Sequence, residues 1–347
     1  MARHSPQMGS DPLVTVVIPT WNRALYLPEA VNSALQQRAP WEIEVIIVDD
    51  GSDDETESLA REIQASDRRA RYLRQERRGP SAARNLGLAK ARGAFVQFLD
   101  SDDLLLPSKL LKQVALLQAT PRAVAATCAV GLFKGDSFTG SMTEVVEAEV
   151  GSPDGLIARF LRGQGFLSLA PLYRTEACRR VGGWNEVLWN FEDWDFNIRI
   201  ALLGRPILHT RECLAASRIH GGTRLSTCPR LAKLEWYELF LGAVEAALSA
   251  STLDSRWYST ELAAAYRRLC SWYARVGKTR AARRCARAAR RKAPARKARL
   301  FHAFLEVALG YQWAGISIWL YDRLISAWRR GQKPVEMRLA TKRDRNA

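Results

Sequence analysis

Three carboxylates crowd the end of an apolar run in this sequence. In FVQFLDSDDLLLP, residues 95–107, the apolar part ends in Asp100, Asp102 and Asp103. Like charges a few ångströms apart repel, and desolvating an unpaired carboxylate costs far more than a surface contact returns. The cluster is therefore either a solvated turn or part of a site with a positive partner.

Two other acidic groups stand where chemistry is possible. Asp49 and Asp50 end a second apolar run, where a carboxylate could accept an N–H from a uracil-like base or simply cap the following helix. Glu192, Asp193 and Asp195 precede or open a predicted helix. The positive end of a helix dipole stabilises carboxylates there without any catalytic role. From the residues alone, a structural role and a chemical role therefore both stay open.

The elements that must position these groups alternate between strand and helix. We predict strands over 13–20, 43–52, 70–75 and 94–100, with helices over about 25–37, from about 53, and over 79–93. This alternation predicts βαβ units and a mostly parallel α/β sheet flanked by helices. Ligands of such sheets bind beyond the carboxyl ends of the strands. The polar residues that should meet there are Thr20 with Asn22, Asp49 with Asp50, and Asp100 with Asp102.

The rest of the chain changes gradually to an all-helical pattern. We expect a helix to about 118, a strand near 123–133, a short helix from 175, a helix over 192–204 and a strand leading to 217–226. The region 134–165 has no assignable pattern, and the chain beyond about 229 reads as helical. Residues 262–294 resemble one tetratricopeptide-type hairpin, but a solenoid needs about three repeats, so we expect an appended helical region.

Composition describes a globular protein with an uneven charge. The chain has 347 residues, of which 47% are hydrophobic and 25% are charged, and its formal net charge is +16. Between Arg267 and Arg299 there are 14 Lys or Arg residues, and no acidic residue occurs between Glu261 and Glu306. Such charge attracts phosphates, nucleic acids or anionic lipid surfaces, or it keeps a helical region soluble.

Cysteine usage and the chain's first residues indicate the compartment. Six scattered cysteines form no CxxC pair, so neither a disulfide framework nor a zinc site is suggested. The first 12 residues lack the apolar segment of a secretory signal and are expected to be disordered. Residues 300–330 are rich in Trp and Tyr but interrupted by charges, which favours an interfacial or packed amphipathic helix. We therefore expect a cytoplasmic protein, peripheral at the inner face of the cell membrane.

Several common catalytic motifs are missing from the sequence, whereas four blocks of residues carry a resemblance. No phosphate loop, dinucleotide fingerprint, nucleophile elbow or HExxH helix follows the predicted elements. The four blocks are VVIPTWNR, VIIVDDGSDDET, RGPSAARNLGLAKARGAFVQFLDSDDLLLP and GGWNEVLWNFEDWDF. In this order they resemble the motifs of family 2 glycosyltransferases, which have the GT-A fold. The resemblance implies a GT-A domain over 13–228 and leaves the basic helical region 229–347 unexplained.

The resemblance implies a donor site for a nucleotide sugar. Asp100 would face the ribose, and Asp102, in the Asp-x-Asp motif, would hold Mn²⁺ or Mg²⁺ with the donor diphosphate, which the metal neutralises as it departs. His220 would complete the metal shell, and Arg218 and Arg224 could reach the diphosphate. The donor-binding set that the resemblance implies is Pro19, Thr20, Asn22, Asp49, Asp50, Arg84, Asn85, Asp100, Ser101 and Asp102.

The resemblance also implies the reaction. Asp193 would be the general base that deprotonates the acceptor hydroxyl, since a sugar hydroxyl is otherwise a poor nucleophile. One base and one displacement imply inversion at the anomeric carbon. Glu192, Trp194 and Asp195 would support the base or contact the acceptor. Trp184, Trp189 and Trp194 could equally stack on sugars or pack in the core.

Two functions are therefore compared. The first is a metal-dependent inverting glycosyltransferase that moves a sugar, from a UDP-sugar donor, to a glycan or lipid-linked acceptor in cell-envelope or exported polysaccharide synthesis. The second is a non-catalytic nucleotide-binding module tethered by its basic tail to membrane or nucleic acid. Intact Asp102 and Asp193 favour the enzyme. Nucleic acid is the weaker partner for the tail because no recognised reading motif accompanies the charge.

Overall fold

The computed structural model describes residues 14–147, 152–219, 229–251 and 255–292. Two compact units divide after Ala265. The predicted disordered N-terminus at 1–12, the amphipathic segment at 300–330, His220 and Arg224 lie outside the described residues. Every helix in the described part of the chain is too short or too polar to span a membrane.

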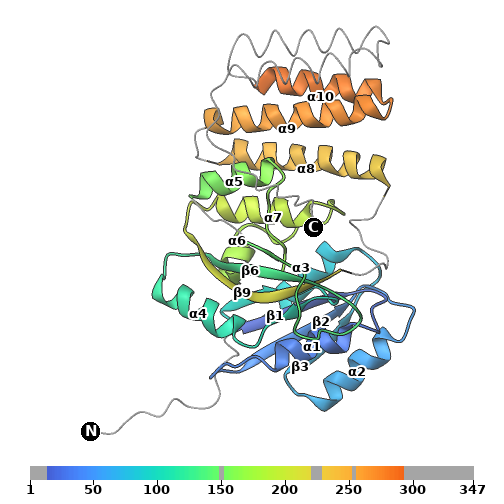
Figure 1. The fold of residues 1–347 in the computed structure, drawn as a ribbon, viewed down its shortest axis with the longest axis vertical. Helices are drawn as coiled ribbons and strands as arrows, with labels where there is room; N and C mark the ends of the chain where they lie inside the picture. Colours follow the sequence, from blue (N-terminus) through green and yellow to red (C-terminus); the bar gives the residue numbers. More distant parts are fainter. Residues whose placement is uncertain (1–13, 148–151, 220–228, 252–254, 293–347) are drawn as a thin grey trace, which may run out of the picture. The chain divides into compact units, whose positions relative to one another are not determined.

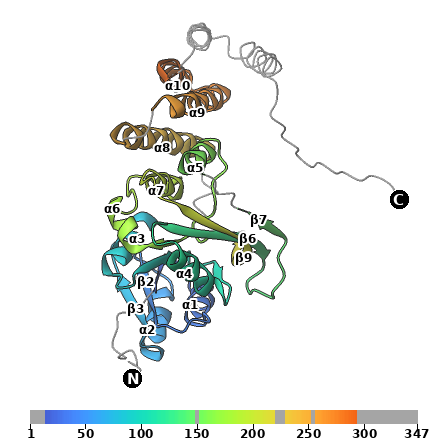
Figure 2. The ribbon, with the colours of Figure 1, turned by 90° about the vertical axis from the view of Figure 1, so that its left-hand side faces the viewer.

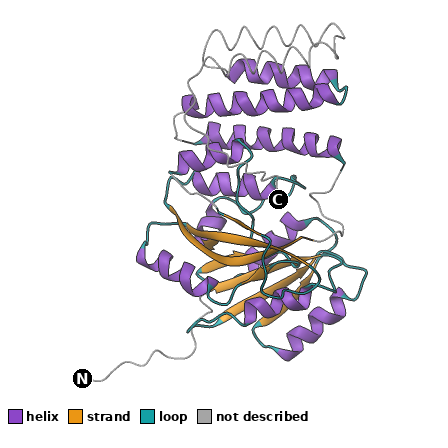
Figure 3. Ribbon diagram, in the orientation of Figure 1, coloured by secondary structure: helices purple, strands orange, loops and turns teal. Residues whose placement is uncertain are grey.

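A nine-stranded sheet organises the described part of the first unit (Figures 1 and 3). The strands are β1 (Val14–Thr20), β2 (Ile43–Asp49), β3 (Ala70–Arg74), β4 (Phe95–Phe98), β5 (Leu104–Leu105), β6 (Ala125–Lys134), β7 (Glu144–Val146), β8 (Leu172–Arg174) and β9 (Ile207–Ile219). Their order is β3-β2-β1-β4-β8-β6-β9-β5, with β7 paired to β6. Strands β1 to β4 run parallel, as do β6 and β9, whereas β8 is antiparallel to β4 and β6.

Ten helices accompany these strands in the described residues. They are α1 (Leu27–Leu35), α2 (Thr56–Ser66), α3 (Pro80–Lys90), α4 (Lys109–Ala119), α5 (Pro153–Leu161), α6 (Thr175–Arg180), α7 (Glu192–Ala201), α8 (Arg230–Ala250), α9 (Ser255–Arg275) and α10 (Thr279–Lys292). The views in Figures 1 and 2 place α5 and α8 beside α7. In the sequence after β9, the described elements are all helices.

Strands β1 and β2 form the centre of the sheet because both of their faces are covered. Every residue of VTVVIPT and of IEVIIVD is buried, as expected for parallel strands with helices on each side. Val16 and Ile18 belong to the same core cluster as residues of α1 and α4. Val17 points the other way, against Gly87 of α3, where an added Cβ would lie 2.3 Å from its Cγ1. The close approach of α3 to β1 thus requires glycine.

The predicted α/β architecture with a mostly parallel sheet is confirmed. The first four strands and the helices between them lie within a few residues of their predicted bounds, because their apolar runs are long. Strands β5, β7 and β8 and helix α5 were not predicted. Strands β7 and β8 have three residues each, which is too short for a period to be read, and α5 lies in the region that had no assignable pattern.

Gly93 packs against the backbone and gives a test of the fold. A Cβ at this position would lie 2.6 Å from the Thr15 nitrogen and 2.8 Å from the Val14 carbonyl carbon. We expect Gly93→Ala to cost about 1–3 kcal/mol of unfolding free energy because backbone cannot move aside cheaply. The control is Gly242→Ala in α8, where nothing lies within 4 Å and Ala favours the helix. Urea unfolding should show the first variant destabilised and the second not; equal stabilities would contradict this packing.

Candidate functional site

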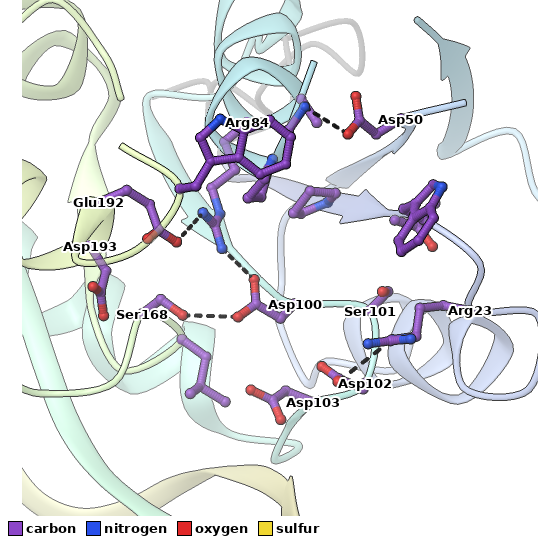
Figure 4. Close-up of a pocket in the computed structure, with 18 of the residues that line it drawn as sticks. Arg23, Asp50, Arg84, Asp100, Ser101, Asp102, Asp103, Ser168, Glu192 and Asp193 are labelled. Carbon is purple, nitrogen blue, oxygen red and sulfur yellow. Dashed lines mark hydrogen bonds and ion pairs between the residues drawn. The ribbon is translucent and has the colours of Figure 1, made fainter. Parts of the chain in front are cut away.

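One cavity of about 680 Å³ collects residues from the loops that follow β1, β2 and β4 and from the beginnings of α3 and α7. Figure 4 shows the charged residues that line it. Of the predicted site residues, those that line the cavity are Pro19, Thr20, Asp50, Arg84, Asp100, Ser101, Asp102, Trp189, Glu192, Asp193 and Arg218. The parallel strands therefore bring polar residues together at their carboxyl edge, as predicted.

Arg84 lies between the two halves of the cavity. Its side chain is 4% exposed, and its Nη2 and Nη1 donate to Asp100 at 2.7 Å and to Glu192 at 3.2 Å (Figure 4). The guanidinium also lies over the Trp184 ring, 4.4 Å from its centroid. Burial opposes the charge, but the two carboxylates outweigh burial and raise the pKa of Arg84 above its usual value. Arg84 is therefore a permanent buried cation.

Asp100 and Asp193 face this cation from different elements. The second oxygen of Asp100 accepts a hydrogen bond from the Ser168 hydroxyl at 3.1 Å. Asp193, the second residue of α7, accepts from the Trp194 backbone N–H at 2.9 Å. Burial and the negative charge of Glu192 raise the pKa of Asp193 to about 8, although Arg84 opposes the shift. A carboxyl with this proton affinity is suited to accept a proton near neutral pH.

The other two carboxylates of the triplet differ in environment. Asp102 has 18% of its side chain exposed, and its Oδ2 lies 3.8 Å from the Nε of Arg23 in an ion pair. Asp103 is buried and accepts from the Arg218 backbone N–H at 2.9 Å. Burial, with the charges of Asp102 and Asp100, raises the pKa of Asp103 well above its usual value. Asp102 is thus the more accessible carboxylate of the two.

Both the backbone and the side chain of Arg218 donate hydrogen bonds to this acidic turn. It lines the cavity, but the side chain is buried and donates to the Asp102 carbonyl at 3.0 Å, to the Gly135 carbonyl at 2.6 Å and to Glu29. The guanidinium also lies over the Tyr26 and Phe133 rings. The sequence-based prediction directed this guanidinium at a diphosphate; in the described structure it bonds to the Asp102 and Gly135 carbonyls and to the Glu29 carboxylate.

Asp50 shapes the opposite end of the cavity. Its carboxylate accepts from the backbone N–H groups of Arg78 and Gly79 and from the Gln75 amide, each at 2.8 Å. Gly79 has φ +93°, a conformation that favours glycine, and it begins α3. Nearby, the Oγ1 of Thr20 is buried and makes no hydrogen bond within the described structure. A bound ligand could satisfy this hydroxyl.

Five predicted site residues lie behind the cavity wall and hold it in place. Asp49 accepts from the Ser52 backbone and hydroxyl and from the Tyr72 hydroxyl. Asn22 exchanges hydrogen bonds with Asp53. Asp195 pairs with Arg199 at 2.7 Å. The remaining two are Asn85, which bonds to Trp184 and Glu186, and Trp194, which packs on Phe160, Phe191 and Phe240.

Several lining residues were not predicted as site residues. Trp21 and Arg23 stand inside the VVIPTWNR block, and Arg77, over the Trp21 ring at 3.3 Å, precedes the GPSA block, so adjacency to a motif could have pointed to them. Ser168 lies in a loop with no motif. Only its contact with Asp100 in the folded chain identifies it.

The metal prediction concerns Asp102 and His220. Among the described residues, no group of three His, Cys, Asp or Glu side chains is arranged to hold an ion. His220 lies outside that part of the chain. Any cation held by Asp102 would therefore complete its coordination with ligands beyond these side chains, for which phosphate oxygens are chemically suited.

The chain has relatives that match over different lengths. A model described as glycosyl transferase family 2 matches residues 15–182. The uncharacterized glycosyltransferase RP339 of Rickettsia prowazekii is 31% identical over 240 residues, which cover 66% of this chain and 70% of the relative. A Campylobacter jejuni GalNAc(5)-diNAcBac-PP-undecaprenol beta-1,3-glucosyltransferase is 33% identical over 155 residues, 43% of this chain and 49% of that one. For three further relatives, the match to this chain spans only 18% to 41% of the relative's own length.

Solved structures resemble the fold. S. aureus TarS 1–349 in complex with UDP has a TM-score of 0.64 at 19% identity, with 92% of each chain covered. The mannosyltransferase PcManGT from Pyrobaculum calidifontis, in complex with GDP-Man and Mn²⁺, has a TM-score of 0.53 at 20% identity, covering 94% of this chain and 88% of that one. These likenesses show the shared GT-A fold. With the match to the family model and a 31% identical relative covered over 70% of its length, the chain belongs to glycosyl transferase family 2.

Proposed function

We propose that this protein is an inverting glycosyltransferase that moves a sugar from a UDP-sugar to a hydroxyl of a glycan or lipid-linked acceptor. The observation that carries the proposal is the Arg84 bridge, which holds Asp100 and Glu192 together, beside Asp193, in one cavity. A role in cell-envelope or exported polysaccharide synthesis is supported by the name of the Campylobacter relative, whose acceptor is undecaprenol-linked.

On the donor side, the proposal assigns the nucleoside to the end of the cavity near Thr20 and Asp50. The unpaired Thr20 hydroxyl supplies a hydrogen bond, and Asp50 keeps the Gly79 turn in place. Asp100 takes the ribose side, with Ser101 beside it in the same turn. Likeness in fold to a protein solved with UDP supports this assignment.

A divalent cation fits the acidic turn. Asp102 presents an accessible carboxylate to the cavity, beside the buried Asp103, whose pKa is raised by burial and by the charges of Asp102 and Asp100. Mn²⁺ or Mg²⁺ held by Asp102, with His220 as a further proposed ligand, would neutralise charge on the departing diphosphate. Arg218 holds the Asp102 carbonyl and therefore fixes the turn that presents this carboxylate.

On the acceptor side, Asp193 takes the proton from the attacking hydroxyl. The hydroxyl oxygen forms a bond to the anomeric carbon while that carbon loses its bond to the diphosphate, so one displacement inverts the centre. Glu192 increases the proton affinity of Asp193 by its charge, and Arg84 keeps Glu192 in place. After transfer Asp193 carries the proton, which it releases to solvent before the next turnover.

Asp193→Asn tests the base assignment. The amide cannot accept a proton, so nucleotide release from UDP-, GDP- and dTDP-sugars with Mn²⁺ should fall by about 10²–10⁴. UDP affinity, measured by calorimetry, should stay within about twofold. In wild type, kcat/KM should rise with pH up to about 8 as Asp193 ionises. Equal activity of the two proteins would overturn the assignment.

The same variant should change how stability depends on pH. Between the usual value of 3.8 and about 8, the unfolded wild-type chain releases the Asp193 proton while the folded chain keeps it. Wild-type stability should therefore fall as pH rises through this window. Asp193→Asn lacks this contribution. Urea unfolding should therefore show that the unfolding free energy of the variant, relative to that of wild type, increases as pH rises from 4 to 8. Parallel pH curves would contradict the shifted pKa.

Asp102→Asn tests the cation site. The amide is a weaker ligand without charge, so the Mn²⁺ concentration for half-maximal nucleotide release should rise by about tenfold or more. The control is Asp136→Asn, which removes an exposed carboxylate outside the cavity lining. This variant should leave the Mn²⁺ concentration for half-maximal nucleotide release unchanged. If neither variant changes the Mn²⁺ requirement, Asp102 is not the ligand.

We also propose that the basic C-terminal unit contacts an anionic membrane surface. Residues 266–347 contain 22 Lys or Arg and 4 Asp or Glu, whereas the whole chain contains 52 and 36. The excess positive charge therefore lies entirely in this unit. On α10, one face buries small side chains, and the arginines exposed on the other are Arg280, Arg284, Arg287, Arg290 and Arg291. Anionic lipids attract such a row, and lipid-linked acceptors are found at membranes.

Sedimentation with vesicles tests this contact. Full-length protein should sediment with vesicles that contain phosphatidylglycerol at low salt, and much less with pure phosphatidylcholine or at 0.5 M NaCl. Replacing Arg280, Arg284, Arg287 and Arg291 by Gln should reduce sedimentation while nucleotide release in solution stays unchanged. Failure of the wild-type protein to sediment at low salt would remove this proposal and leave the transferase proposal intact.

A further inference from the structure

Helix α7, which carries Glu192 and Asp193, begins at a strained residue. Phe191 precedes the helix with φ 63° and ψ 13°, the left-handed region. Among the described residues, Asn22 is the other non-glycine residue with positive φ. For a bulky aromatic residue this conformation is energetically costly, and it persists only where the surrounding structure imposes it. The residues that contact Phe191 are therefore those that hold its backbone in this conformation.

Two aromatic residues of α8 hold the Phe191 ring. The Phe191 centroid lies 5.1 Å from that of Tyr237 and 5.8 Å from that of Phe240. Tyr237 is 4% exposed and Phe240 is fully buried. Phe240 also meets Trp194, at 6.1 Å, so it contacts residues on both sides of Asp193 in the sequence. The packing of α7 against α8 (Figures 1 and 2) is thus built from rings that flank the proposed base.

The segment before Phe191 is held from the donor side. The Trp189 ring covers Gly79, where an added Cβ would lie 3.4 Å from the ring. Gly79 in turn donates its backbone N–H to Asp50. Residues 189–191 therefore lie between the turn that Asp50 fixes and the aromatic side chains of α8, and both attachments orient the start of α7.

We infer that Tyr237 and Phe240 are positioning residues for Asp193, acting through the strained backbone of Phe191. Helix α8 lies beyond residues 15–182, which the family model matches. The inference rests on the proposed role of Asp193 as base. Without the aromatic contacts, Phe191 relaxes toward a less costly conformation and displaces Asp193, two residues further on. A displacement of about 1 Å at a catalytic group can cost about 10²-fold in rate.

The test compares four variants of the full-length protein. Phe240→Ala and Tyr237→Ala remove the contacts with Phe191, and Tyr237→Phe keeps the ring. Leu248→Ala is the matched control, because Leu248 is 5% exposed on the same helix and lies eight residues, about 12 Å, beyond Phe240. The probe is UDP-GlcNAc with Mn²⁺, water serving as acceptor. UDP release reports the reaction, and calorimetry reports UDP affinity.

Phe240→Ala and Tyr237→Ala should lower kcat by about tenfold or more while the Kd for UDP changes less than about twofold. Tyr237→Phe should recover most of the rate lost in Tyr237→Ala. Leu248→Ala should lose thermal stability but keep its kcat. If Leu248→Ala and Phe240→Ala reduce kcat equally, or if loss of UDP affinity accounts for the effect, α8 has only a general stabilising role.

The pH profile separates positioning from loss of fold. The charged or titratable groups around Asp193 are Glu192 of its own helix, Arg84 of α3, Asp100 after β4 and Tyr173 of β8. When the start of α7 shifts, Asp193 gains water, and the rising limb of kcat/KM in Phe240→Ala should move to lower pH. An unchanged limb would contradict the inference.

Hydrogen exchange gives a readout that needs no activity. Peptides that cover 189–196 should exchange faster in Phe240→Ala than in Leu248→Ala, and equal exchange would overturn the inference. If Asp193→Asn keeps full activity, the proposed function fails instead. If Asp193→Asn is inactive while Phe240→Ala matches wild type in rate and exchange, the inference alone fails.

Discussion

The cavity depends on one buried cation. Arg84 is 4% exposed and has two carboxylate partners, Asp100 and Glu192, from opposite sides of the site. Desolvating a guanidinium is costly, and removing one partner of a buried pair typically costs about 3–5 kcal/mol because a charge is left uncompensated. The chain therefore folds stably only when the turn after β4 and the start of α7 both approach α3. Electrostatic compensation by Arg84 therefore joins the two sides of the cavity.

Acidic residues that look alike in sequence have different tasks in the fold. Asp49 and Asp195 are fully engaged in hydrogen bonds or an ion pair behind the wall, whereas Asp102 stays accessible. Asp193 is held where burial and a neighbouring negative charge raise its pKa. Environment rather than residue type thus assigns each carboxylate its role, and the crowding of charge at the strand end serves both structure and chemistry.

Sequence patterns predicted the parallel half of the sheet well, because the runs that form β1 and β2 are apolar throughout and end in polar residues. They also predicted that Asp50, Asp100 and Asp102 would meet at the carboxyl edge, whereas Asp49, predicted with them, does not line the cavity. They could not predict that Arg84 pairs with Glu192, since 108 positions separate the two and either could have been solvated. Ser168 and the ring contacts of α8 were missed for the same reason, because contacts between distant segments leave no local period.

The contact between α8 and Phe191 also bears on how the parts of this protein can be exchanged. The family match ends at residue 182, and the helical region after β9 looks in sequence like an appendage that relatives could replace freely. Phe191 nevertheless packs against Tyr237 and Phe240 of α8, and Trp194 packs against Phe240. A chimera joined between β9 and α8 would separate these contacting rings, whereas one joined after Ala250 would keep them in one chain. The packing around Phe191 therefore extends into α8.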